Sequence, residues 1–169
     1  MRSLPIAVAA SLALVSISTS LQGQRAAAAI DPRSLQLVAE GRAARTAGNL
    51  DAATDAFETA IAVDPRNRAA FVALADTSEA RGLPGKAIRL YREALELDPN
   101  DTTALAGQGE ALVTKGAVNL ARANLSKIQA LCKGACPPAT QLAAAIAKGP
   151  PAAPPVAAAQ TSTVTPPRE

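Results

Sequence analysis

The chain has 169 residues, of which 49% are hydrophobic and only 2% aromatic, so its core must be built from alanine, leucine, valine and isoleucine. It contains no histidine, which excludes histidine-based catalytic triads, general bases and metal sites. The formal charge is +3, but without Arg2 and Arg25 near the N-terminus 15 basic residues face 14 acidic ones. A nucleic-acid binder normally has a strongly basic face, so we predict no nucleic-acid partner.

Residues 1–29 have the pattern of a Sec-type signal peptide. Arg2 supplies the positive start, an apolar stretch runs from Leu4 to Ile17, and Ala26 to Ala29 offer small residues for cleavage. The apolar stretch is too short for an ordinary transmembrane helix. We therefore predict cleavage near Ala29 and a bacterial protein that is periplasmic or secreted, without membrane insertion after removal of the signal. The alternative is a retained anchor or an amphipathic helix.

After this segment the sequence repeats with a period of 34 residues, in units at about 34–67, 68–101 and 102–133. The recurring residues are Gly41, Ala75 and Gly109; Gly48, Gly82 and Gly116; Ala53, Ala87 and Ala121; Phe57, Tyr91 and Leu125; and Ala60, Ala94 and Ile128. In each unit two stretches with helical spacing are separated by a glycine, which takes the left-handed conformation after a helix at little cost. Each unit is therefore predicted to be a pair of helices.

The first helix is expected to start at Asp31-Pro32, a capping residue followed by proline in the first turn, and to reach about Ala47. The residues at helical spacing along it are Leu35, Val38, Ala39, Arg42 and Ala43. The second helix is expected over 50–63, and Pro65 cannot continue it. The second unit repeats this scheme, and the small alanines suggest that the helices of a pair cross closely.

The third unit keeps Gly109 and Gly116 but lacks the aromatic residue and the closing proline. Terminal repeats are often atypical because one side has no neighbour. A capping helix is predicted over 138–148, with a frayed alanine-rich tail as the alternative. Residues 149–169 are rich in proline and alanine and are predicted to be a disordered tail.

The 34-residue spacing and the recurring small residues resemble the tetratricopeptide repeat family, known as TPR. The resemblance implies an all-α fold over residues 30–148. It would be an α-α superhelix, a TPR-like solenoid of three helix-turn-helix repeats plus a C-terminal capping helix. Such arrays bind other proteins.

The resemblance also implies a binding surface, because the first helices of TPR pairs line a concave groove that holds an extended peptide or a partner helix. Matching positions in this sequence are Leu35, Val38, Arg42, Arg45, Ala69, Val72, Asp76, Glu79, Thr103, Ala106 and Glu110. The groove would be basic at the first unit and acidic over the next two. The TPR subfamily that clamps a terminal carboxylate needs Lys and Asn at several of these sites, so we do not predict carboxylate capture. The alternative for each residue is a solvated helix face.

Cys132 and Cys136 are the only cysteines, and in an exported protein such a close pair is most simply a disulfide. The alternative is a thiol-redox site, although three residues separate the cysteines where the thioredoxin-like motif has two. Two thiols without a histidine do not complete a metal site. No phosphate-binding loop or dinucleotide fingerprint is present, so no cofactor is predicted.

These observations favour a non-catalytic protein-protein interaction module, an adaptor or scaffold in the cell envelope or in secretion, whose partner is another protein or peptide. The alternatives are a structural protein that self-associates by stacking of its repeats and a thiol-redox enzyme that uses the two cysteines.

Overall fold

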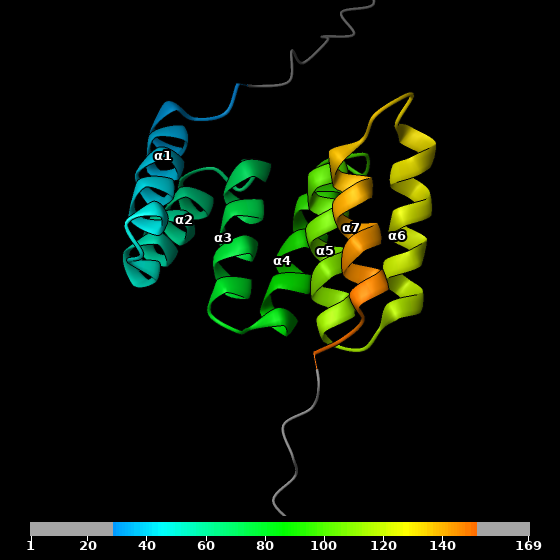
Figure 1. Ribbon diagram of the computed structural model, residues 1–169. Coiled ribbons are helices and arrows are strands. Elements are labelled where there is room, and N and C mark those ends of the chain that lie inside the picture. The colour runs from blue at the N-terminus through cyan, green and yellow to red at the C-terminus, as the bar shows by residue number, and fades with distance from the viewer. Residues whose placement is uncertain (1–28, 152–169) are drawn as a thin grey trace, which may run out of the picture.

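The computed structural model describes residues 29–151 and contains seven helices and no strand in that range (Figure 1). The signal peptide predicted over 1–29, except its last residue, and the tail from residue 152 onwards lie outside the described residues. The helices are α1 (Pro32–Thr46), α2 (Leu50–Val63), α3 (Arg68–Ala80), α4 (Pro84–Leu97), α5 (Thr102–Thr114), α6 (Val118–Leu131) and α7 (Pro137–Lys148). No helix among residues 29–151 is both long enough and apolar enough to cross a membrane.

The helices form three antiparallel pairs that stack in chain order, α1 with α2, α3 with α4, and α5 with α6 (Figure 1). The turn inside each pair is made by a glycine with positive φ, namely Gly48, Gly82 and Gly116. Helix α7 packs on α5 and α6. The predicted all-α superhelix of three helix pairs with one further helix is therefore confirmed.

The core consists of alanines at the helix crossings and one large side chain for each of the first two units. Ala53, Ala60, Ala87 and Ala94 are fully buried. The Phe57 ring packs between α1 and α3, while the Tyr91 ring packs against Gly107 of α5. Small residues at these positions allow the backbones to approach closely, and the two aromatic rings fill the space between successive units.

Of the residues at helical spacing along α1, only Val38 lies on its buried face. The buried residues of α1 are Ser34, Val38 and Gly41, whereas Leu35 is 51% exposed, and Ala39, Arg42 and Ala43 are also exposed. The Ser34 hydroxyl donates a hydrogen bond to the Ala60 carbonyl oxygen (2.7 Å) and accepts one from Asn67 Nδ2 (2.8 Å). A serine whose hydroxyl is paired in this way can be buried without leaving an unsatisfied polar group.

Helix α7 starts at Pro137, one residue earlier than expected, and covers the C-terminal end of the stack. Its Leu142 is fully buried and lies so close to Gly109 of α5 that a Cβ atom there would be 2.6 Å from the leucine Cδ1. The helix is therefore packed into the domain. It occupies the place that the first helix of a fourth unit would take.

Candidate functional site: the concave groove

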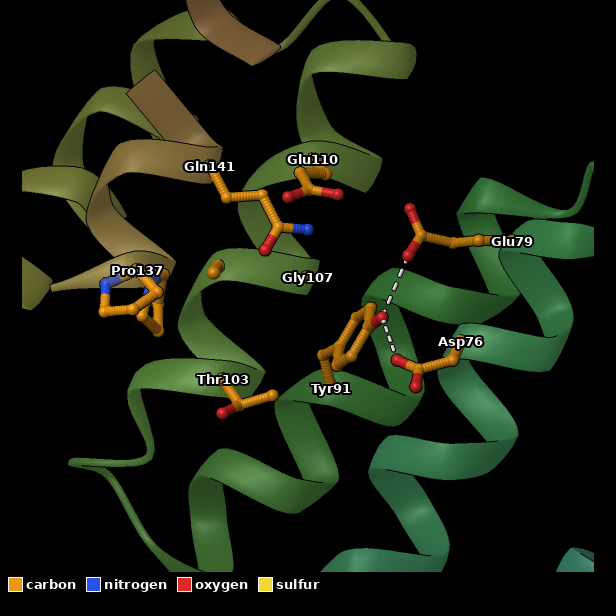
Figure 2. A pocket seen from close by; sticks show the side chains of 10 residues that line it. Asp76, Glu79, Tyr91, Thr103, Gly107, Glu110, Pro137 and Gln141 are labelled. Atoms are coloured by element: carbon orange, nitrogen blue, oxygen red, sulfur yellow. Dashed lines mark hydrogen bonds between the residues drawn. The ribbon is translucent and has the colours of Figure 1, made fainter. Parts of the chain in front are cut away.

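The first helices of the units, α1, α3 and α5, lie next to one another, and α7 continues the row. Between α3, α5 and α7 their inner faces enclose a cavity of about 380 Å³, shown in Figure 2. We call it the acidic cavity. It is lined by Asp76, Glu79, Tyr91, Thr103, Ala106, Gly107, Glu110, Pro137, Pro138 and Gln141.

Three carboxylates face the acidic cavity. Asp76 and Glu79 lie one turn apart on α3, and Glu110 projects from α5 on the opposite side (Figure 2). No lysine or arginine among residues 29–151 lines this cavity. The site therefore concentrates negative charge on a surface that is partly shielded from water.

The Tyr91 hydroxyl connects two of these carboxylates. Its Oη lies 2.7 Å from Asp76 Oδ1 and 2.8 Å from Glu79 Oε2 (Figure 2). A phenol has one proton and can donate to only one of them at a time. The second contact is a hydrogen bond when the Glu79 carboxyl is protonated and donates to Tyr91 Oη.

The surroundings favour this protonated form. Burial, helped by the negative charges of Glu110 and Asp76, raises the pKa of Glu79 to about 7, although the Tyr91 hydrogen bond opposes the shift. Burial and the charge of Asp76 also raise the pKa of Glu110, against a hydrogen bond from Gln141. Burial and the two neighbouring carboxylates raise the pKa of Tyr91, so this phenol stays protonated.

Glu110 has a further distinctive feature. Its Oε1 atom is buried and has no hydrogen-bond partner among the described residues. Buried acceptors are normally paired, and leaving one unpaired costs about 1–3 kcal/mol. The atom belongs to a side chain that lines the acidic cavity.

The groove continues beyond the acidic cavity in both directions. Towards α1, Thr103 also lines a recess of about 170 Å³, whose other lining residues are Arg42, Arg68, Ala69, Val72 and Asp101. Towards the C-terminal end of α7, Glu79 and Glu110 also line a second cavity of about 440 Å³, which reaches Lys148 and the segment 149–151. An extended chain could thus run along the row of first helices.

Most of the expected groove residues lie along this path. Asp76, Glu79, Ala106 and Glu110 line the acidic cavity, and Val72 and Arg42 line the recess. Arg45 Nη1 donates to Asp76 Oδ2 at 2.9 Å and so joins α1 to α3 at the edge of the groove.

Val38 does not belong to the groove. Its side chain is only 4% exposed and lies in the same core cluster as Phe57, so its assignment to the groove is corrected. Leu35 lies on the exposed face of α1 and lines none of the three groove cavities.

Tyr91 and α7 contribute to the groove in ways that sequence reasoning missed. In the sequence Tyr91 stands out only as a member of a recurring repeat position, yet its hydroxyl reaches the groove. Pro137 stands 34 residues after Thr103, an expected groove position, so continuing the repeat spacing by one more unit would have predicted it. Gln141 stands 34 residues after Gly107, which lines the same cavity but was not among the expected positions. The sequence predicted only a capping role for α7, which was therefore not treated as a further first helix of the groove.

The structure pairs Cys132 with Cys136 in a disulfide at the junction between α6 and α7. Cys132 follows the last residue of α6, and Cys136 precedes the first residue of α7. The pair thus closes the loop that leads into the helix bordering the groove.

Comparisons with known proteins identify the fold. The sequence profile of the tetratricopeptide repeat family matches residues 38–102 and, with overlap, 79–135. No curated protein sequence matches the chain.

Among solved structures, the Sgt2 TPR domain of Aspergillus fumigatus is 24% identical and covers 79% of this chain and 95% of its own, with a TM-score of 0.64. The first TPR domain of Spaghetti (RPAP3), bound to the HSP90 peptide SRMEEVD, is 20% identical, covers 69% and 91%, and has a TM-score of 0.63. The second TPR domain of human RPAP3, in complex with the HSP70 peptide SGPTIEEVD, is 20% identical, covers 67% and 94%, and has a TM-score of 0.62.

Proposed function

The chain belongs to the tetratricopeptide repeat family, and from this premise we propose that it is a non-catalytic protein-protein interaction module that holds a segment of a partner protein in its concave groove. The observation that carries the proposal is the continuous row of cavities along α1, α3, α5 and α7, which together extend over the inner faces of all four helices. A groove of this kind fits an extended peptide or a single helix.

The similar structures support this use of the groove. Two of them are TPR domains in complex with chaperone peptides, SRMEEVD and SGPTIEEVD. Both peptides end in acidic residues, whereas the central part of the present groove is itself acidic. From these similar structures we therefore infer peptide binding in general, but not binding of the same acidic peptides.

We place this activity in the bacterial periplasm or outside the cell, where the protein would act as an adaptor or scaffold. The proposal is supported by the signal-like residues 1–29 and by the cysteine pair, since disulfides persist in oxidising compartments. A structural role by repeat stacking has less support, because α7 already packs over the C-terminal end and buries Leu142 there.

Site-specific photo-crosslinking in the producing cells tests the groove. A photoreactive amino acid at Thr103 or Gln141, two exposed positions that line the acidic cavity, should form an adduct of defined mass with a partner. The matched control is Lys127, which is exposed on α6 and lines none of the groove cavities. Adducts that form equally well at Lys127, or none at the groove positions, would contradict the proposal.

A further inference from the structure

The geometry points to a lysine or arginine side chain, carried by an extended segment of the partner protein, as the group that occupies the acidic cavity. This inference rests on the proposed function and specifies the chemistry of the ligand. It assigns to Asp76, Glu79 and Glu110 the role of receiving the cation.

The first argument is charge complementarity. Three carboxylates from α3 and α5 line one cavity, and no cation among residues 29–151 lines it with them. The one basic partner at its edge, Arg45, bonds the Oδ2 atom of Asp76, and Glu79 and Glu110 have no ionic partner within the described part of the chain. Carboxylates in such surroundings repel one another, and a cation between them relieves the repulsion.

The second argument is the buried Oε1 atom of Glu110. A carboxylate oxygen only accepts hydrogen bonds, so a partner for this atom must bring a donor. Lysine and arginine bring donors that also carry the complementary charge, and charge-assisted bonds of this type are the strong ones. Oε1 is closed off from solvent but belongs to a side chain that lines the cavity, so a turn of the Glu110 carboxylate would bring it to a donor that enters there.

The third argument is the shape of the cavity. Ala106, Pro137 and Pro138 contribute apolar surface to its wall, opposite the carboxylates of α3. Lysine and arginine have long apolar stems below a charged head, and such stems lie well against apolar surface. The adjoining recess at Thr103 and the second cavity at Glu79 and Glu110 leave room for the chain on either side of the inserted residue.

Selection from a random peptide library tests the inference, because it works without an identified partner. Phages that display random twelve-residue peptides are selected on the purified protein and on the double variant Glu79→Gln plus Glu110→Gln. A matched control is Glu96→Gln, which changes an exposed glutamate of α4 that lines none of the groove cavities. Circular dichroism must show the same helicity for all three proteins. Peptides selected on the parent and on Glu96→Gln should share a lysine or arginine, and the double variant should not enrich it.

One selected peptide is then synthesised with a fluorescent label, and its basic residue is replaced by norleucine or citrulline. For the parent protein, fluorescence anisotropy should show that the altered peptide binds at least about tenfold more weakly than the original peptide. For the double variant the replacement should change the affinity little, because this protein already lacks two of the carboxylates that the basic residue contacts. Raising the salt concentration should weaken the parent complex more than the complex of the double variant.

The outcomes separate the two proposals. The variant Thr103→Trp fills the groove and serves as a test of groove binding. If selected peptides bind the parent but not this variant, and still bind after their basic residue is replaced, the inference is overturned and the proposed function stands. The same holds if their binding depends on acidic residues. If no selected peptide distinguishes the parent from Thr103→Trp, the groove function fails and this inference fails with it.

Discussion

Replacing Gly41 of α1 by alanine should destabilise the protein, although the same exchange normally stabilises a helix. Alanine in a helix interior gains about 1 kcal/mol over glycine. A Cβ atom at Gly41, however, would lie 2.5, 2.8 and 2.9 Å from three atoms of the Phe57 ring. The ring is fully buried and cannot swing away. Overpacking of this kind costs about 1–3 kcal/mol, so we expect a net loss of about 1 kcal/mol in the free energy of unfolding.

Urea unfolding followed by circular dichroism measures this loss. Gly85→Ala in α4 is the matched control, because a Cβ atom there meets nothing within 4 Å, and it should be neutral or slightly stabilising. In a Phe57→Leu background the effect of Gly41→Ala should change sign, because the smaller side chain leaves room for the methyl group. If Gly41→Ala stabilises the parent protein as Gly85→Ala does, the packing of Phe57 on α1 is refuted.

Three other expected outcomes rest on the described contacts and on the sequence. The pKa of Glu79 is about 7 when folded against 4.5 as its ordinary value, so the folded state binds this proton more tightly and the free energy of unfolding should fall as the pH rises from about 5 to about 8. Because solvent partly screens this side chain, we expect a fall of about 1 kcal/mol. Urea titrations should show that Glu79→Gln removes most of this slope and Glu96→Gln does not. Cys132→Ser combined with Cys136→Ser should lower the free energy of unfolding by about 2 kcal/mol, the loop-entropy value for so short a loop, and an unchanged melting temperature in calorimetry would contradict a stabilising disulfide. Mass spectrometry of the protein from its producing cells should find a chain that begins close to residue 30; the mass of the whole 169-residue chain would contradict export.

The fold could be predicted because it depends on local rules that repeat. A glycine after each first helix, alanines at each crossing and one aromatic residue in each of the first two units are visible in the sequence, and the structure uses them at the expected places. The face of α1 could not be predicted in the same way. Its burial depends on Ser34, a polar residue whose partners come from α2 and from the turn before α3, and sequence periodicity counts such a residue as exposed.

The groove was predicted in part. The resemblance to TPR arrays indicated Asp76, Glu79 and Glu110, because it assigns the groove to the first helices, whose matching positions recur every 34 residues. Spacing could not indicate that the hydroxyl of Tyr91 joins two of these carboxylates, since this depends on how far the α4 ring reaches between α3 and α5. The raised pKa of Glu79 follows from that same three-dimensional arrangement and has no counterpart in the local sequence.

The charges of the groove are not required by the fold. The equivalent positions 45, 79 and 113 hold arginine, glutamate and valine, and 42, 76 and 110 hold arginine, aspartate and glutamate. The first helices of the three units thus accept a cation, an anion or, at the buried Val113, an apolar side chain at these sites. At Glu79 the anion even lowers stability near neutral pH, because burial holds its pKa above the ordinary value. A charge that the repeat does not require, at a position where it lowers stability, supports our proposal that a cation enters this cavity, because a cation there would offset the cost.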